Sequence, residues 1–482
     1  MDAERFESPF GWRYGSETMR ALWSEPTKRR LMRRVWLALA AAERDAGLVS
    51  EEQLADLERT AQAIDIERAH EIEATTRHDV MAELLAWAEQ APVGGPILHL
   101  GATSADVTDN VDLLRVRDGL GLLREALGAT ILAFARRVDE TADLPTLGWT
   151  HLQPAAPTTV GYRLAATLQD LVDDLREIDG LVGSLRSKGF KGAVGTGASY
   201  AALLEGHSTT AAELEAMAMA RLGLTPAPVT TQVYARKTDW RVLNALAGIA
   251  ASASTFAFHV RLMQSPPFGE WSEGFAEGQV GSSAMPWKRN PVNAETVNSL
   301  ARFVAALPAV AWGNATLSLL ERTLDDSANR RVVLPEAFLA VDEILRRTRE
   351  LIERLAIEPE AVRATLARYG PFAATERVLL AAAAAGGDRQ ALHERLRRHS
   401  MRAWPAVERG EPNPLADALA ADPDLTRYVD SGTIRRLLGQ PEAHVGDAPA
   451  RARAMASLAR LAVSREAANA AVDTAGAPEP PM

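Results

Sequence analysis

The stretch VDLLRVRDGLGLLREALGATILAFARRV, residues 111–138, decides the fold. Its large apolar side chains recur at intervals of three and four, at Leu113, Val116, Leu120, Leu123, Leu127, Ile131, Phe134 and Val138. This spacing puts them on one face of a helix that is more than ~30 Å long. A second stripe has the same spacing, at Leu164, Leu168, Leu171, Leu175, Ile178, Val182 and Leu185. Two such helices predict a bundle of long helices packed side by side.

The rest of the chain also has a helical pattern. Further helices are predicted at residues 24–47, with Ser24 as its N-cap, at 243–262 and at 300–320, the last interrupted by Pro308. No segment with the alternating period of a strand competes, so the predicted fold class is all-α. After about residue 357 the sequence is richer in Ala and Arg and its helical pieces are shorter. The last dozen residues have the composition of a disordered tail.

The composition excludes several classes of protein. The chain has 482 residues and no cysteine, which excludes disulfides, thiolate metal sites, iron–sulfur clusters and cysteine nucleophiles. Its formal net charge is −10 and no segment concentrates basic residues, so we expect no nucleic-acid partner. The sequence has no run of ~18 apolar residues, so we expect no membrane-spanning helix. The first residues lack the basic-then-apolar order of a signal peptide, so we expect a cytoplasmic protein without a membrane partner.

Lysine is rare in this chain. Only five of the 53 basic residues are lysines, namely Lys28, Lys188, Lys191, Lys237 and Lys288. A lysine kept in so arginine-rich a sequence indicates a place where the wider guanidinium does not fit.

Five polar or glycine-rich stretches break the helical pattern, and such exceptions are often functional. They are residues 76–79, 101–110, 150–154, 281–291 and 321–331. The fourth, GSSAMPWKRNP, reads as a loop whose backbone amides could cradle an anion. In the fifth, Arg322 and Arg331 on either side of Ser327 could hold a phosphate or carboxylate. Each stretch alone also has an ordinary explanation as a hydrogen-bonded histidine, a helix cap, a linker or a solvated ion-pair face.

Together the five stretches identify a protein family far more specifically than any one of them does. Residues 281–291 have every fixed position of the fumarase/aspartase superfamily loop, Gly-Ser-Ser-x-x-Pro-x-Lys-x-Asn-Pro. Thr103-Ser104 and Thr150-His151 are similar to two further short motifs of that superfamily. Within it, the chain most closely resembles the adenylosuccinate lyases of the animal-like branch. This resemblance runs from about residue 13 to about residue 389 and is carried by residues 77–82, 101–110, 143–148, 191–196 and 321–331.

The resemblance implies an all-α fold with three helical domains, the central one a long-helix bundle of the fumarase/aspartase type. For this chain it gives an N-terminal domain at 1–103, a central domain at 104–357, a C-terminal domain at 358–470 and a disordered tail at 471–482. It further implies a homotetramer in which each active site is built from three chains. No metal and no organic cofactor is expected.

The implied reaction is a β-elimination that releases fumarate from adenylosuccinate and leaves AMP. Enzymes of the family also cleave the succinyl-carboxamide ribotide of purine synthesis. A base takes a proton from the carbon next to a carboxylate, and an acid protonates the leaving nitrogen. By resemblance, Ser282 is the base, with Ser283 less favoured, and His151 is the acid. Loop amides and Lys288 would stabilise the Ser282 alkoxide, and His78 would assist and orient.

The other matched residues are expected to bind substrate. Thr103, Ser104, Lys288 and Asn290 match groups that hold the fumarate carboxylates, and Gln232 matches a substrate-binding glutamine. Arg77 and Asp79, on either side of His78, are assigned to the same role. The nucleotide side, mainly its phosphate, is matched by Arg13, Tyr14, Arg322, Ser327 and Arg331. This set favours a substrate that carries AMP over the substrates of other superfamily members.

Three positions depart from the family pattern. Tyr162 stands where the family usually has Lys, Gly197 where the animal-like branch has Gln, and Thr296 where that branch has Arg. The first and third changes each remove a positive charge, and the second removes an amide. They motivate an alternative, a specialised lyase that releases fumarate from another N-succinyl compound in secondary metabolism. A second alternative is an inactive structural protein on the same fold, against which the retention of Ser282 and both histidines argues.

Overall fold

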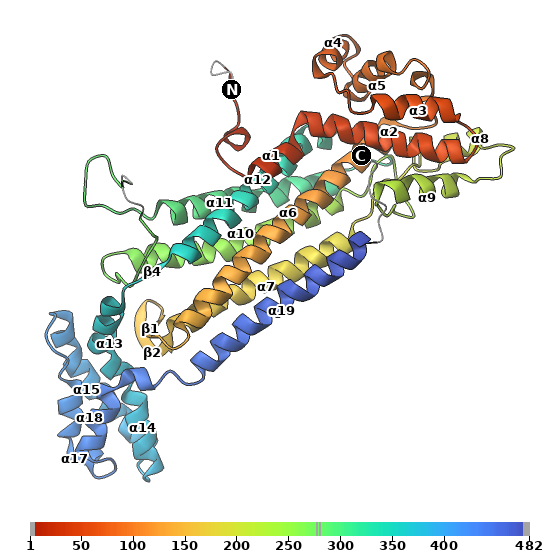
Figure 1. Ribbon diagram of the computed structural model, residues 1–482. Helices are drawn as coiled ribbons and strands as arrows, with labels where there is room; N and C mark the ends of the chain where they lie inside the picture. Colours follow the sequence, from red (N-terminus) through yellow and green to blue (C-terminus); the bar gives the residue numbers. More distant parts are fainter. Residues whose placement is uncertain (1–4, 276–277, 279–280, 476–482) are drawn as a thin grey trace.

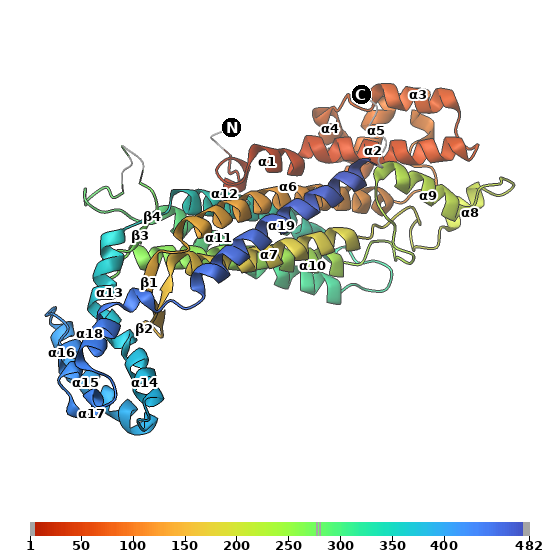
Figure 2. The same ribbon diagram turned by 60° about the horizontal axis from the view of Figure 1, so that its bottom comes forward.

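The computed structural model describes residues 5–275, 278 and 281–475 (Figure 1). Its centre is a bundle of long helices that lie side by side in both views (Figures 1 and 2). They are α6 (Ser104–Thr141), α7 (Val160–Ser184), α10 (Lys237–Gln264), α11 (Val292–Thr316), α12 (Asp325–Arg354) and α19 (Ala448–Ala475). The all-α fold class predicted from the sequence is therefore confirmed.

The apolar stripe of α6 forms the centre of this bundle. All eight residues from Leu113 to Val138 that define the stripe are 0–1% exposed. They pack against α7, α12 and α19, and the stripe of α7 is buried in the same core. The spacing of three and four thus works as predicted, because it keeps one face of a long helix out of water over its whole length.

Helix α10 is apolar on several faces. By length and composition alone it would pass as a helix that crosses a membrane, and half of its most apolar window is buried. It packs against α7, α11 and α12. A place inside a bundle accounts for this composition.

The N-terminal part lies across one end of the bundle (Figure 2). It consists of a short turn η1 (Pro9–Gly11) and helices α1 (Glu17–Trp23), α2 (Glu25–Asp45), α3 (Glu51–Thr60), α4 (Ile66–Thr76) and α5 (Asp79–Gln90). Ser24 caps α2 as predicted, since its side chain accepts from the amide of Thr27. Two short helices, α8 (Ala198–Leu203) and α9 (Ala211–Leu222), pack nearby, α9 directly against α2.

The C-terminal part has a small apolar core of its own, separate from the bundle core. Its helices are α13 (Pro359–Ala373), α14 (Thr375–Ala384), α15 (Arg389–Glu408), α16 (Leu415–Ala420), α17 (Pro423–Thr426) and α18 (Ser431–Gly439). The chain then returns to the bundle as α19, which packs on α6 and α7.

This return differs from the predicted division of the chain. We assigned residues 448–470 to the C-terminal domain, but Ala452, Ala456 and Ala459 of α19 are fully buried in the bundle core. Small side chains at this spacing let two helices approach closely without a stripe of large apolar residues. Residues 471–475, predicted as part of a disordered tail, lie within α19, and 476–482 lie outside the described residues. The boundaries near residues 103 and 357 stay predictions.

The expectation that no strands form was wrong for two short pairs. β1 (Pro145–Thr150) and β2 (Gln153–Thr159) form an antiparallel hairpin, and β3 (Trp271–Ser272) pairs with β4 (Ala356–Ile357). The register of the hairpin shifts between Leu147 and Trp149. Gly148 sits at this shift, where a Cβ would lie 2.5 Å from the carbonyl oxygen of Ala156. The shift and the short strands hide the alternating period on which the prediction relied.

Candidate active site

The first group of predicted site residues gathers where α5 and α6 begin. Thr103 is the N-cap of α6 and Ser104 its first residue, while His78 is the N-cap of α5. His78 Nδ1 accepts from the amide of Met81 at 3.3 Å, and its Nε2 lies 3.4 Å from Ser104 Oγ. Since Nδ1 is an acceptor, a neutral ring carries its proton on Nε2 and donates it toward Ser104. The structure thus brings together two stretches that are 26 residues apart in sequence.

Asp79 joins Arg331 to this group. Its carboxylate accepts from Lys28 at 3.3 Å and from Arg331 at 3.0 Å. Burial acts to raise the pKa of Asp79, but Lys28 and Arg331 outweigh it and the pKa is lowered. Asp79 is therefore a carboxylate at neutral pH, and it holds the predicted phosphate ligand Arg331 beside His78. Arg77, with a left-handed φ of 53°, ends α4 and sets the direction of the chain into His78.

The second arginine of the predicted phosphate set is held by buried charges. Arg322 donates to Asp326 at 2.8 Å, and Asp326 accepts from Arg236 at 2.6 Å. Arg236 also makes two bonds to Asp109 of α6, at 3.0 and 3.1 Å. Burial acts to raise the pKa of Asp326, but the two arginines lower it. This chain of charges fixes the start of α12, and with it the half-buried Ser327, against α6.

Arg13 and Tyr14 lie before α1, alongside a later part of α12. Ser8 donates to Glu336 there, and the amide of Gly15 donates to Glu343. Arg13 is exposed, with its guanidinium carbon 5.8 Å from the centre of the Tyr14 ring. The two residues thus border the helix that carries Ser327 and Arg331, but the described contacts do not join them to the His78 group.

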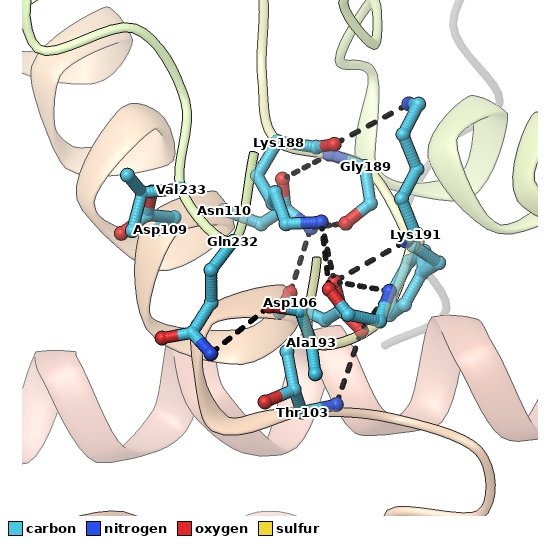
Figure 3. Close-up of polar contacts among 12 residues, drawn as sticks. Thr103, Asp106, Asp109, Asn110, Lys188, Gly189, Lys191, Ala193, Gln232 and Val233 are labelled. Carbon is cyan, nitrogen blue, oxygen red and sulfur yellow. Dashed lines mark hydrogen bonds and ion pairs between the residues drawn. The ribbon is translucent and has the colours of Figure 1, made fainter. Parts of the chain in front are cut away.

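Gln232 joins the start of the 321–331 stretch to the segment around Ala193. Its Nε2 donates to the carbonyl of Ala193 at 3.1 Å, and its main-chain amide donates to the carbonyl of Glu321 at 3.1 Å. The 188–193 segment is bound in turn to Asp106, three residues after Thr103 (Figure 3). Gln232 therefore lies in the same part of the molecule as Thr103 and Arg322.

His151 lies in the turn of the β1–β2 hairpin. Thr150 pairs with Gln153, so His151 and Leu152 form a two-residue turn in which both have positive φ, 54° and 57°. Such values are unfavourable for residues with large side chains and cost on the order of 1–3 kcal/mol each. His151 is exposed, and the turn holds it at the tip of the hairpin.

The 281–291 loop is closed at its base and exposed along its length. Asn290 Nδ2 donates to the carbonyl of Gly281 at 2.9 Å. Ser282 Oγ accepts from the amides of Ala284 at 3.4 Å and Met285 at 3.1 Å. Lys288 is exposed, and Trp287 beside it is 78% exposed. Two backbone donors on one serine oxygen are what an alkoxide at that position would need.

Two residues that the sequence reasoning missed hold the end of this loop. Gln264, the last residue of α10, donates to the carbonyl of Arg289 at 3.0 Å and accepts from the amide of Glu273 at 2.9 Å. The buried Glu273 accepts from the amides of Asn293 and Ala294, each at 3.1 Å, and so caps α11. Burial raises the pKa of Glu273, and these amides oppose the rise. The sequence carries no signal for either residue, because both act through distant backbone groups.

The predicted residues lie at the two ends of the bundle. Helices α4 and α5, with His78, lie at one end, while the β1–β2 hairpin with His151 and the segment that leads into α11 lie at the other (Figure 2). One chain therefore does not bring His78, His151 and Ser282 together. The sequence-based expectation that each site is shared between chains stays a prediction.

The three departures from the family pattern lie in different places. Tyr162 is in the first turn of α7, directly after β2, and is 41% exposed. Gly197 has a φ of 69° at the start of α8, a conformation that glycine adopts without strain. Thr296 donates to the carbonyl of Val292 at 2.8 Å in the first turn of α11. None of the three disturbs the contacts described above.

Comparison with known proteins identifies the family of this chain. A family model described as "Lyase" matches residues 18–305, and one described as "Adenylosuccinate lyase C-terminus" matches residues 371–455. The adenylosuccinate lyase of Schistosoma mansoni is 38% identical over 87% of this chain and 88% of its own length. That of Saccharomyces cerevisiae is 37% identical over 93% of each chain. The chain belongs to the adenylosuccinate lyase family.

More distant relatives extend the family likeness. The adenylosuccinate lyase of the archaeon Pyrococcus abyssi is 32% identical over 91% of this chain and 95% of its own length. This identity is lower than that to the Schistosoma mansoni and Saccharomyces cerevisiae enzymes. Among solved structures, a fumarate lyase from Mesorhizobium sp. BNC1 superposes with a TM-score of 0.81 at 23% identity, over 94% of this chain and 99% of that one. This last likeness supports the fold alone.

Proposed function

We propose that this chain cleaves adenylosuccinate to AMP and fumarate by β-elimination, as an enzyme of purine biosynthesis. The observation that carries the proposal is its likeness to adenylosuccinate lyases over about nine-tenths of its length, with the 281–291 loop intact. The proposal includes the second family reaction, cleavage of the succinyl-carboxamide ribotide. A cytoplasmic location stays a prediction.

Ser282 is the proposed base. Its alkoxide would take a proton from the carbon next to a carboxylate, and the electron pair of that bond would form the double bond of fumarate as the carbon–nitrogen bond breaks. The amides of Ala284 and Met285 point at Ser282 Oγ and support this role, since they would stabilise the negative oxygen. Lys288, further along the loop, is proposed to add positive charge, and Asn290 to hold both the loop base and a substrate carboxylate.

His151 is the proposed acid, which gives its proton to the leaving nitrogen of AMP. Its strained two-residue turn supports the role, because unfavourable backbone conformations persist mainly where function needs a side chain in a set direction. His78 is proposed to assist from a site beside Ser104, with its donating nitrogen toward that hydroxyl.

The substrate is proposed to bind between the two remaining sets. Thr103, Ser104 and Gln232, with Arg77 near them, would hold the succinyl carboxylates at the start of α6. Asp79, itself a carboxylate, would contribute to substrate binding by holding Arg331 in place. Arg13, Tyr14, Arg322, Ser327 and Arg331 would bind the nucleotide, mainly its phosphate. Support comes from Ser327 and Arg331, which lie in the first turns of α12, and from Arg322 just before that helix. Bonds from guanidinium to phosphate are among the strongest that side chains make.

A homotetramer with shared sites is the proposed assembly. The separation of His78 from His151 and Ser282 supports it, because these residues can form one site only when another chain supplies the missing ones. Large apolar side chains of the bundle also face outward, among them Phe258 of α10 and Trp312 of α11, each 57% exposed, and Leu320 in the connection after α11 is 89% exposed. Exposed apolar surface of this kind is typical of subunit interfaces.

The test is to incubate the purified protein with adenylosuccinate and to follow AMP and fumarate by chromatography and ultraviolet absorbance. Rapid formation of both products in equal amounts is the expected result. A folded, tetrameric protein that leaves adenylosuccinate intact would contradict the proposal. A screen of other N-succinyl compounds for fumarate release would then follow.

A further inference from the structure

Asp106 is the centre of a buried polar network at the start of α6 (Figure 3). The residue is 0% exposed, and both of its carboxylate oxygens accept hydrogen bonds. Its Oδ2 accepts from the amide of Thr103 at 3.1 Å and from the hydroxyl of Tyr200 at 3.3 Å. Its Oδ1 accepts from the amide of Lys191 at 3.2 Å, and the amide of Gly192 reaches both oxygens.

Lys188 supplies the charge that lets this carboxylate stay buried. Its ammonium is 3.1 Å from Asp106 Oδ1 and donates to the carbonyl of Gly192 at 3.3 Å. The lysine is itself 0% exposed. Burial lowers its pKa and Asp106 opposes that change. Lys188 is one of the five lysines of the chain, and its ammonium forms a compact buried ion pair.

The network joins residues of the proposed site that are far apart in sequence. On one side Asp106 holds the backbone of Thr103, next to Ser104 and His78. On the other side it holds the 191–192 backbone, and the neighbouring Ala193 carbonyl accepts from Gln232. A shift of Asp106 would therefore move both ends of the proposed carboxylate-binding surface.

We propose that Asp106, paired with Lys188, is a positioning residue that sets Thr103, Ser104 and Gln232 for binding of the fumarate part of the substrate. This proposal rests on the proposed function. Asp106 touches no substrate; it acts by fixing backbone groups, so its loss weakens binding of the dicarboxylate in the ground state and the transition state alike. Such a loss raises KM more than it lowers kcat.

The test uses Asp106→Asn in the full-length protein. The asparagine side chain has one acceptor oxygen, whereas the aspartate has two. Its NH₂ group would face a donor, either the amide of Thr103 or the ammonium of Lys188. The KM for adenylosuccinate and the inhibition constant of fumarate are expected to rise about 10- to 100-fold, since displacements of ~1 Å in a binding site have effects of this size. Inhibition by AMP should stay unchanged, because the nucleotide is bound by another set of residues.

Two further variants keep the test decisive. Tyr200→Phe removes a single donor to Asp106 and leaves the ion pair in place, so this variant should fold. Its inhibition constant for fumarate should be about two- to fivefold higher than that of wild type. Asp422→Asn is the matched control: Asp422 is a buried carboxylate, paired with Arg395 and His399, in the separate C-terminal core. It should lower thermal stability without changing either inhibition constant.

The outcomes separate this proposal from the function on which it rests. Wild-type protein that does not convert adenylosuccinate would count against the function. Active wild type with unchanged fumarate inhibition in both Asp106→Asn and Tyr200→Phe would overturn the positioning role. Equal weakening of fumarate and AMP inhibition would also overturn it, since that pattern indicates general damage.

Discussion

Asp106 at the start of α6 is fully buried and accepts hydrogen bonds on both carboxylate oxygens, whereas Ser282 lies in an exposed loop in which Trp287 is 78% exposed. We call the first region the α6 corner, meaning Thr103, Ser104 and Asp106 with residues 188–193. The second is the 281–291 loop. The corner is held by a buried ion pair and many backbone donors. The loop is held by two side-chain amides, those of Asn290 and Gln264.

This difference indicates that the two regions have different roles within one chain. A corner fixed from inside can keep carboxylate-binding groups in place before substrate arrives, which avoids an ordering cost on binding. A loop held only at its base can meet a neighbouring chain and complete the site there. The predictions below separate effects on binding, expected from the corner and from α12, from effects on chemistry, expected from the loop.

The largest effect should come from Ser282→Ala. Removal of a general base is expected to lower kcat about 10²- to 10⁴-fold, while the affinity for adenylosuccinate stays near that of wild type. Single-turnover kinetics and calorimetric titration would measure the two quantities. Ser283→Ala is the control and should remain active. An active Ser282→Ala enzyme beside an inactive Ser283→Ala enzyme would move the base role to Ser283.

Arg331→Ala should affect binding of the nucleotide alone. Loss of charged hydrogen bonds to phosphate is expected to raise the KM for adenylosuccinate and the inhibition constant of AMP about 10- to 100-fold. Inhibition by fumarate should not change, in contrast to Asp106→Asn. Arg363→Ala, which removes an exposed arginine of α13, is the control. An unchanged KM in Arg331→Ala would refute the phosphate assignment.

Gln264→Ala should loosen the loop without touching the corner. It removes the bonds to Arg289 and Glu273, and kcat is expected to fall about 5- to 20-fold, with both product inhibition constants nearly unchanged. Steady-state kinetics would measure this. Asn244→Ala, an exposed amide on the same helix, is the control. A rise in the inhibition constant of fumarate, without a fall in kcat, would contradict the different roles given to the α6 corner and the 281–291 loop.

The smallest effect concerns a buried acid near the corner. Glu43 of α2 is 1% exposed, and burial raises its pKa from 4.5 to about 8. The folded protein then holds a proton that the unfolded chain releases, so stability is highest below pH 4.5 and falls as the pH rises toward 8. Glu43→Gln should remove this loss, on the order of 4 kcal/mol at pH 8.

Thermal unfolding from pH 5 to 9 would check this prediction. Wild type should lose more stability than Glu43→Gln as the pH rises, and the exposed Glu52→Gln should behave as wild type. Parallel curves for Glu43→Gln and wild type would show that Glu43 is ionised in the folded protein. Activity at pH 7 should be unchanged in both variants.

The sequence predicted the elements whose signal is local. The Leu113 to Val138 stripe, the Ser24 cap and the 281–291 loop each depend on residues close in sequence, and the structure has them where expected. The hairpin was missed because a bulge at Gly148 breaks its period. Helix α19 was assigned to the wrong part because its contact face consists of alanines, which carry little hydrophobic signal.

Prediction of the site from the sequence was limited in the same way, to residues with a local signal. Motif residues such as His78, Ser282 and Arg331 could be named from the sequence, but the groups that hold them could not. Asp106 is recognisable as a helix-capping residue three positions after Thr103, yet its pairing with Lys188 joins residues 82 positions apart. Gln264 and Glu273 bind backbone groups, and backbone groups leave no trace in a sequence pattern.

The central claim is that residues from the two ends of the bundle meet only between chains. The most direct measurement mixes inactive His78→Gln and Ser282→Ala proteins, dissociates and reassembles them, and assays adenylosuccinate cleavage. Random reassembly should give about one quarter native sites, and activity should return toward that fraction of wild type. Mixed tetramers, verified by native mass spectrometry, that regain no activity would contradict the account.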